Sequence, residues 1–238
     1  MSNTQKIQWK RLSVEAAAIV ASILLAFAID AWWDHRKDLI AEVEILHSLE
    51  DEFAANRETL LQDIEYVRTY SQAIQRLLVA YEGTSTSRQS AESIGVDLWH
   101  SMSWRTSNLS TGTLDSVVGS GRLEIIRDQR LRAALAGWPA RLDDLAEEEI
   151  YEWLEVTERY RPFVGQIIPI PSLATWVYSS EGAERKSPDP DLLRHLLKSV
   201  EFGSLLSMRL DVSLVALKDK NDTLAELNRI LDFLKDAS

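Results

Sequence analysis

Apolar residues form one long run near the start of the chain, residues 12–33. Its central fourteen residues include a single polar side chain, that of Ser22. Trp9 and Trp32 are 23 residues apart, which is about 34 Å in an α-helix, and the hydrocarbon core of a bilayer is about 30 Å thick. Tryptophans favour the interface between membrane and water. The run therefore predicts one transmembrane helix, with Trp9 at one interface and Trp32 and Trp33 at the other.

Two other interpretations of this run stay open. A buried helix of a soluble protein has a similar apolar length, but tryptophan and basic flanks are untypical of such a helix. A cleaved signal peptide is the second alternative, because Ala26-Phe27-Ala28 resembles a cleavage site behind a basic segment. Glu15 at the start of the run argues against cleavage, as does the lack of any helix-breaking Gly or Pro before that site. We expect an uncleaved anchor.

The charges on the two sides of the run predict its orientation. Three basic residues precede it, and Arg36 and Lys37 follow closely. A short, positively charged tail tends to stay in the cytoplasm, whereas a long following domain is readily translocated. We therefore predict a short cytoplasmic tail over residues 1–11, an anchor over residues 12–33 and a domain over residues 34–238. In a bacterium, this places the anchor in the inner membrane and the bulk of the chain in the periplasm.

The remainder of the chain has the pattern of helices. Apolar residues recur every three or four positions from Leu39 to Leu78, which predicts one long helix or two helices end to end, stopped at Gly83. Pro162, Pro169 and Pro171 mark a connection, in which residues 167–170 are the one candidate for an extended piece. The fold class expected is all-α, an anchor that continues into a bundle of about five helices. The further helices are expected at residues 91–104, from a cap at Thr113 to Gly119 or Gly121, from a cap at Asp128 to a break at Gly137 and Pro139, at residues 140–160, from a cap at Asp189, and at residues 205–234.

Charge and composition narrow the classes of function. The formal net charge of -11 argues against nucleic acid as a partner and against a domain lying flat on anionic lipid. The chain has no cysteine, so disulfides, thiolate metal sites and a cysteine nucleophile are excluded. About 200 residues outside the anchor are enough for one good core.

We find no pattern that predicts catalysis, a cofactor or a metal site. Glu44 and His47 share a helix face, as carboxylate and imidazole do in di-iron bundles, but such sites need a second pair and two more glutamates. The nearest second pair, Asp97 and His100, has the wrong acid. A chance pair on the surface is the simpler interpretation.

Two features predict contacts with other molecules. Arg122 and Arg127 lie beside a glycine turn and are candidates to hold an anion or a carboxylate of a partner, although surface arginines on a packed turn are the simpler interpretation. In the anchor, small residues at a spacing of four form a stripe along which two helix backbones can approach closely. This stripe predicts a helix contact within the membrane and consists of Ala18, Ser22 and Ala26, extended by Glu15 and Asp30.

Three passages carry a resemblance to a known family. They are EAAAIVASILLAFAIDAWWDHR at 15–36, EVEILHSLEDEFAANRETL at 42–60 and TLDSVVGSGRLEIIRDQRLRAALAGW at 113–138. The chain resembles an uncharacterised group of bacterial membrane proteins with one N-terminal transmembrane helix and a helical domain of unknown function. The resemblance implies an uncleaved anchor and no known reaction, ligand or catalytic residue.

These observations favour a non-enzymatic interaction or scaffold protein, for example an accessory subunit of a larger membrane complex. Its expected partners are the lipid bilayer and other proteins, including further copies of itself. The alternative is a pore or channel subunit, in which several anchors line a path, although Glu15, Ser22 and Asp30 form only a thin polar stripe. A receptor-like sensor domain is a third class, but it requires a second span, and the closing helix carries too many charges to serve as one.

Overall fold

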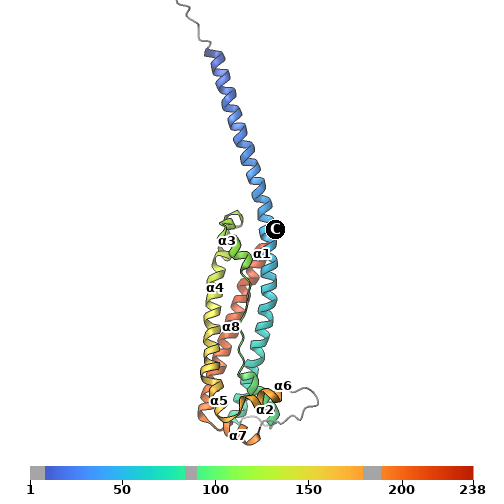
Figure 1. Ribbon diagram of the computed structural model, residues 1–238, viewed down its shortest axis with the longest axis vertical. Coiled ribbons are helices and arrows are strands. Elements are labelled where there is room, and N and C mark those ends of the chain that lie inside the picture. The colour runs from blue at the N-terminus through green and yellow to red at the C-terminus, as the bar shows by residue number, and fades with distance from the viewer. Residues whose placement is uncertain (1–8, 84–89, 179–188, 238) are drawn as a thin grey trace, which may run out of the picture.

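The structure, a computed structural model, describes residues 9–83, 90–178 and 189–237 (Figure 1). Over these ranges the chain is all-α, as the sequence predicts, and contains no strand. The predicted tail lies outside the described residues except for positions 9–11, which already belong to the first helix.

Helix α1, Trp9–Glu82, is one continuous helix of 74 residues, about 110 Å long. It therefore settles the choice between one helix and two in favour of one. Its first part stands clear of the rest of the chain, and its second part is a wall of the bundle (Figure 1). It ends where Gly83 takes a positive φ of 67°, which glycine adopts at little cost.

The apolar part of α1 is exposed. Among the described residues, α1 is the one helix long and apolar enough to cross a membrane by length and composition, and none of its most apolar window is covered by the protein. The window therefore does not lie in the core of this fold. Trp32 and Trp33 are exposed at its end, with ring centroids 6.2 Å apart.

Three long helices carry the core. Helix α8, Val200–Ala237, packs against α1 and against α4, Gln129–Leu154 (Figure 1). The C-terminal end of α8 lies beside α1 near the point where the apolar part of α1 leaves the domain. Phe53 of α1 and Trp138 of α4 meet in the half of the core nearer the anchor, with ring centroids 5.3 Å apart.

The predicted break at Gly137 and Pro139 is wrong, because α4 runs through both residues. Leu131, Leu135 and Trp138 of this helix are buried on one side of it, so packing holds the helix together where local preferences would end it. A wider π-helical turn, η2 (Glu155–Tyr160), follows and leads into α5, Arg161–Ile167. Pro162 cannot donate to the preceding turn, which is a common cause of such irregular turns.

Five more helices close the two ends of the bundle, so the described residues contain eight α-helices and not about five. Helices α2 (Ala91–Ser101), α6 (Ile170–Tyr178) and α7 (Pro190–Leu197) lie with α5 at the end far from the anchor (Figure 1). Helix α3 (Gly112–Gly119) and the short 3-10 helix η1 (Arg122–Ile125) lie at the end nearer the anchor. The predicted extended piece at 167–170 is reduced to Ile168, between α5 and α6.

The predicted caps are correct at two of three positions. Asp128 accepts from the N–H groups of Arg130 and Leu131, and Asp189 accepts from that of Asp191. The predicted cap at Thr113 is wrong. Helix α3 begins at Gly112, two residues earlier than a cap at Thr113 implies, and a side chain of α1 replaces a local cap. Glu52 accepts from the N–H groups of Thr113 and Leu114, at 2.7 and 3.2 Å.

Candidate interaction surface

Residues 102–111 form an extended segment, here named the strap, that runs between α2 and α3. The helix predicted to reach Trp104 ends at Ser101 instead. Backbone groups of an extended chain need partners, and polar side chains from the long helices provide them. Asn56 of α1 is one of these side chains: it donates to the carbonyl oxygen of Ser110 and accepts from its N–H, both at 2.7 Å. The side-chain amide of Asn56 thereby binds both backbone groups of Ser110 and holds the strap against α1.

Arg209 of α8 binds the start of the strap from inside the core. Its side chain is fully buried and donates to the carbonyl oxygens of Ser101 and Ser103. The same guanidinium donates to Glu152 of α4 at 2.9 Å and lies over the ring of Tyr70, 4.9 Å from its centroid. One buried cation therefore joins α8, α4, α1 and the strap.

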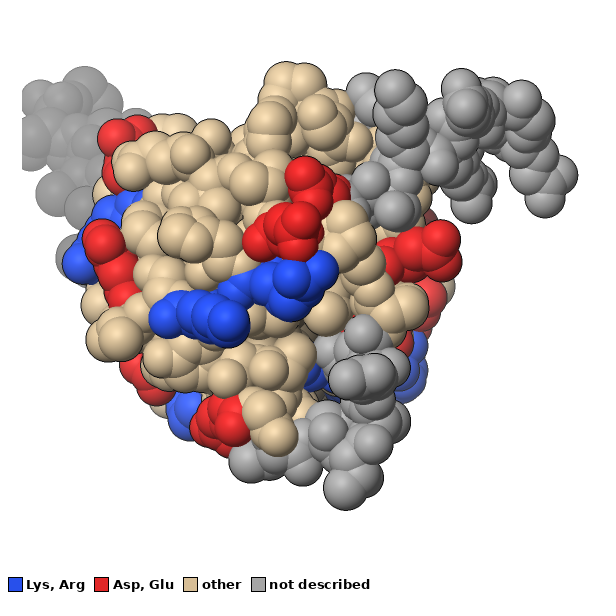
Figure 2. All heavy atoms as spheres, turned by 90° about the horizontal axis from the view of Figure 1, so that it is seen from below, with Lys and Arg blue, Asp and Glu red and all other residues tan. Residues whose placement is uncertain are grey.

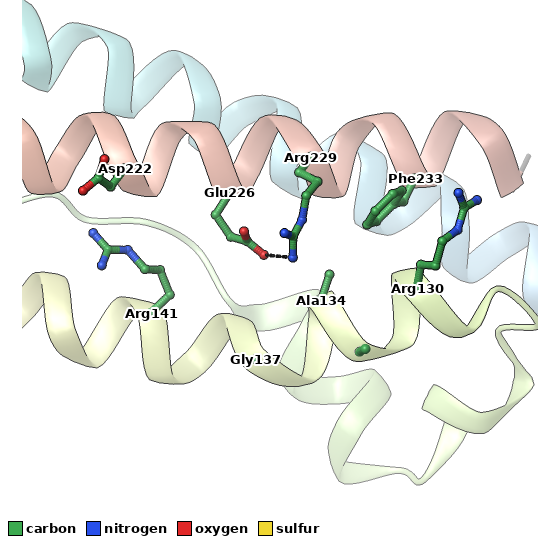
Figure 3. A pocket seen from close by; sticks show the side chains of 9 residues that line it. Arg130, Ala134, Gly137, Arg141, Asp222, Glu226, Arg229 and Phe233 are labelled. Carbon is green, nitrogen blue, oxygen red and sulfur yellow. Dashed lines mark hydrogen bonds and ion pairs between the residues drawn. The ribbon is translucent and has the colours of Figure 1, made fainter.

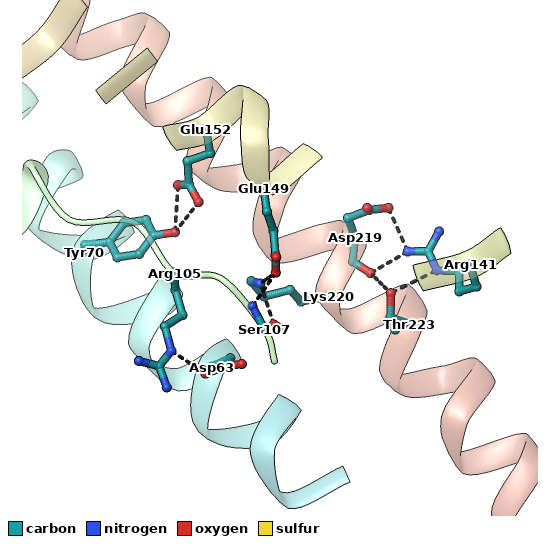
Figure 4. A network of polar contacts seen from close by, with 10 residues as sticks. All are labelled: Asp63, Tyr70, Arg105, Ser107, Arg141, Glu149, Glu152, Asp219, Lys220 and Thr223. Atoms are coloured by element: carbon teal, nitrogen blue, oxygen red, sulfur yellow. Dashed lines mark hydrogen bonds and ion pairs between the residues drawn. The ribbon is translucent and has the colours of Figure 1, made fainter. Parts of the chain in front are cut away.

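Tyr70 completes this cluster on the side of α1. Its hydroxyl donates to the carboxylate of Glu152 at 2.7 Å (Figure 4). Burial raises the pKa of Tyr70 above its usual range, and the adjacent Glu152 carboxylate raises it further. Burial likewise raises the pKa of Tyr160, whose hydroxyl is 2.8 Å from that of Ser101. Both phenols therefore stay protonated at any physiological pH.

A second buried ion pair binds the middle of the strap. Lys220 of α8, fully buried, donates to Glu149 of α4 and, at 2.8 Å, to the hydroxyl of Ser107 (Figure 4). Glu149 also accepts from the N–H of Ser107 at 2.9 Å. Arg105 of the strap pairs with Asp63 of α1. Charges on all three long helices thus hold the strap in one conformation.

The rigid strap carries Trp104 to the surface, where other aromatic side chains surround it. We name this region the aromatic face. Trp104 lies between two shallow cavities of about 210 and 390 Å³, and it lines both of them. Exposed apolar side chains line the second cavity: Ile150 is 56% exposed and Trp153 is 42% exposed. The aromatic face consists of Tyr66, Trp99, Trp104, Ile150, Trp153 and Tyr178, from α1, α2, the strap, α4 and α6.

Two arginines lie beside the aromatic face, and Glu149, which lines its second cavity, is already paired with the buried Lys220. Arg161 lines the same cavity as Trp99 and Trp104, and within the described residues it has no ion pair. Arg105 lies over the ring of Tyr66, 5.6 Å from its centroid. The end of the domain far from the anchor presents mostly uncharged side chains, with a few Lys and Arg side chains next to Asp and Glu (Figure 2). The aromatic face therefore offers apolar area together with an available guanidinium.

A groove apart from the aromatic face lies between α4 and α8 and has a volume of about 540 Å³ (Figure 3). Its floor is formed by small residues of α4 such as Ala134 and Gly137. Arg141 and Arg229 line it, but each pairs at 2.9 Å with an acid of α8, Asp219 and Glu226 respectively. Its cations are therefore engaged within the protein, whereas Arg161 on the aromatic face has no ion pair with any described residue.

The predicted contact residues of the anchor all lie on α1. Glu15, Ala18, Ser22, Ala26 and Asp30 are exposed along its apolar part. The hydroxyl of Ser22 donates to the carbonyl oxygen of Ala18 in the same helix, at 2.8 Å. The stripe is thus on the surface, as a helix contact requires. The side chain of Trp9, one of the three predicted interfacial anchors, lies outside the described residues.

The two predicted arginines are five positions apart in the sequence and have different surroundings. Arg127 finds a carboxylate within its own chain: its Nε donates to Glu42 at 2.6 Å, and its backbone N–H donates to the same side chain at 2.7 Å. Arg122 is exposed in η1. Glu44 and His47 are exposed on α1, and the described residues contain no group of three or more His, Asp or Glu side chains that could hold a metal ion.

Comparisons with protein families, with curated proteins and with solved structures each found no match for this chain. The family resemblance of the three sequence passages therefore stays a prediction. The aromatic face was not predicted from the sequence, which placed Trp104 at the end of a helix and Trp153 among the apolar residues of another. The available signal was a set of tryptophans outside the anchor, of which Trp104 stands between two polar residues, Ser103 and Arg105.

Proposed function

We propose that this protein is a membrane-anchored, non-enzymatic interaction module, and that its aromatic face binds a partner protein outside the bilayer. The anchor would lie in a bacterial inner membrane, with the N-terminus in the cytoplasm and the bulk of the chain in the periplasm. The exposure of the most apolar window of α1 supports membrane insertion, because such a surface is poorly tolerated in water. The basic residues before the run support the orientation.

The observation that carries the proposal is the aromatic face. Tryptophan and tyrosine are enriched among the residues that dominate the binding energy of protein interfaces. Here such side chains are partly exposed around two cavities and rest on a strap held by buried ion pairs. A rigid surface loses little conformational entropy on binding. The partner that fits is a protein segment with apolar side chains for the cavities and a carboxylate for Arg161.

The anchor supports a second contact, self-association. Ile40 and Val43, in the turns of α1 that follow the anchor, are exposed, 55% and 52%. At 100° per residue, Ile40 lies on the same face of the helix as Ser22, whereas the buried Leu49 lies on the opposite face. The contact surface of two anchors would therefore continue a short way beyond the membrane. Because the Ser22 hydroxyl is bonded within its own helix, the stripe favours helix packing over a pore lining.

A pair of aromatic variants tests the partner contact. The full-length protein is purified in mild detergent with its crosslinked partner, and the affinity for that partner is then measured for each variant. Trp104→Ala combined with Trp153→Ala should weaken binding at least about 30-fold, the effect of losing interface residues worth 2 kcal/mol or more. Tyr151→Ala is the control, because Tyr151 is 53% exposed on another side of the same helix. Equal affinities for the two variants would contradict the proposal.

Crosslinking in native membranes tests self-association. The wild type should give dimers or a ladder of copies, and Ser22→Leu should reduce them because a larger side chain fills the groove between the helices. A monomer in both cases would indicate that the stripe contacts a different protein.

A further inference from the structure

The turn between α3 and η1 lies at the end of the domain from which the apolar part of α1 emerges (Figure 1). The ion pair between Arg127 and Glu42 fixes this end against α1. Glu42 follows Trp33 by nine residues, which is about 13 Å along the helix. If Trp33 marks the membrane interface, the headgroup layer occupies about 5 to 7 Å of that length. The remaining gap is short enough for the turn and a long side chain to bridge.

The chemistry of this turn differs from that of the rest of the chain. Its exposed residues between positions 116 and 121 are small or apolar, and Val118 is 47% exposed. Between Asp115 and Glu124 the only charge is that of Arg122, in a chain where acidic residues outnumber basic ones by 37 to 26. Gly121, with a φ of 70°, makes the tight turn that places Arg122 just beyond the end of α3.

Arg122 also differs from its neighbouring arginines. Arg127 binds Glu42, and Arg132 donates to the carbonyl oxygen of Ile126. Within the described residues, Arg122 has no ion pair or hydrogen bond from its side chain. A free guanidinium binds phosphate oxygens through two parallel hydrogen bonds, and the lipid headgroups would present such phosphates within reach of the Arg122 side chain.

We propose that the α3–η1 turn docks on the phosphate headgroups of the membrane that holds the anchor, with Arg122 as the phosphate ligand and Val118 as an apolar contact. The contact rests on the proposed membrane insertion of α1. It holds the domain upright, with the end formed by α2, α6 and α7 away from the membrane. The acidic remainder of the surface favours this posture, because it is repelled by anionic lipid.

The absence of native cysteine allows a clean test with the full-length chain. Three single-cysteine variants carry a fluorophore: Ile23→Cys in the anchor, Ser120→Cys in the turn and Ser204→Cys near the far end of α8. Each is reconstituted in vesicles of phosphatidylcholine and phosphatidylglycerol that contain nitroxide quenchers, either on the acyl chains or on the headgroups. Acyl-chain quenching at position 23 reports the anchor, and headgroup quenching at position 120 reports the turn.

The proposal expects strong headgroup quenching at position 120 and little at position 204. Arg122→Gln should lower the ratio of docked to undocked turns about fivefold in these vesicles, the effect of one basic residue near an anionic surface. Arg194→Gln at the far end is the matched control and should change nothing, because Arg194 is exposed on α7.

The possible failures are distinguishable. An unquenched label at position 23 contradicts membrane insertion itself, and with it the docking. A quenched label at position 23 with an unquenched label at position 120 overturns only the docking. Quenching at position 120 that survives Arg122→Gln unchanged also overturns it, because tethering by α1 would then be a sufficient explanation. Equal quenching at positions 120 and 204 would show a domain that lies flat, which again contradicts the proposal.

Discussion

Replacement of Arg209 by methionine is the most direct test of how the strap is held. Arg209 is fully buried and binds Glu152, whose side chain is 1% exposed. Removing one partner of a buried ion pair leaves an uncompensated charge and typically costs 3–5 kcal/mol. Two carbonyl oxygens, that of Ser101 at the end of α2 and that of Ser103 in the strap, also lose their donor, at roughly 1 kcal/mol or more each. We therefore expect Arg209→Met to lower the free energy of unfolding by at least about 4 kcal/mol.

The assay is thermal unfolding of the full-length chain in detergent, followed by far-ultraviolet circular dichroism. A loss of 4 kcal/mol corresponds to a decrease in Tm of about 8 to 16 °C for a chain of this size. The control is Arg229→Met, the same substitution on the same helix. Arg229 is 59% exposed and pairs with Glu226 one turn away, so its loss should cost less than about 1 kcal/mol.

A double variant separates the charge from the shape of the side chain. Glu152→Gln, added to Arg209→Met, removes the stranded negative charge but keeps an acceptor for the Tyr70 hydroxyl. It should restore about 1 to 3 kcal/mol, a typical coupling energy for residues in contact. If Arg209→Met costs no more than Arg229→Met, the buried cation does not hold the strap and the reasoning is refuted.

Three further predictions follow from the structure. A Cβ at Gly203 would lie 2.3 Å from the ring of Tyr81, so Gly203→Ala should lower the Tm. Gly137→Ala, at an exposed helix position with open space, should instead raise the free energy of unfolding by about 0.5–1 kcal/mol. A higher Tm for both variants would contradict the packing at Gly203. Because the pKa values of the two buried tyrosines are raised, an absorbance titration at alkaline pH should show two fewer phenols ionising in the folded chain than in urea. The contribution of Tyr70 and Tyr160 to the free energy of unfolding is complete below about pH 10 and decreases as the pH rises further, since only the unfolded chain then loses these protons. Ionisation of all six tyrosines before unfolding would contradict the burial of these two. Finally, intact-mass measurement of the membrane-bound protein should give the uncleaved chain, and a mature start at Ile29 would show that the anchor is a signal peptide.

The sequence by itself determined the features that depend on local pattern. A spacing of three and four between apolar residues is specific to helices, so the all-α class and the long last helix were predicted correctly, whereas the choice between one long first helix and two helices end to end was left open. The caps at Asp128 and Asp189 follow the same logic, because a side chain there reaches only the next few N–H groups. The apolar run could likewise be found from its length and flanks alone.

Tertiary contacts decided the rest. Helix α4 continues through Gly137 and Pro139 because one side of it is buried against the core, which a local reading of two helix breakers cannot reveal. Helix α3 is capped by Glu52, about 60 residues away in the sequence, and no nearby side chain signals it. Helix α2 ends at Ser101, and the carbonyl oxygen of Ser101 accepts a hydrogen bond from Arg209, which is 108 residues further along the chain.

The aromatic face depends on these same long-range contacts. Its residues come from five separate segments, and Trp104 joins the others where buried ion pairs hold the strap between α1, α4 and α8. A charged residue in a helical sequence is normally assigned to the solvent side, because the cost of burying a charge is high unless a partner is present. Lys220 and Arg209 are buried nevertheless, because α4 supplies a glutamate as the partner of each. Local periodicity thus determined which segments are helical, whereas the pairing of buried charges between distant helices decided where the strap lies and which side chains reach the surface beside it.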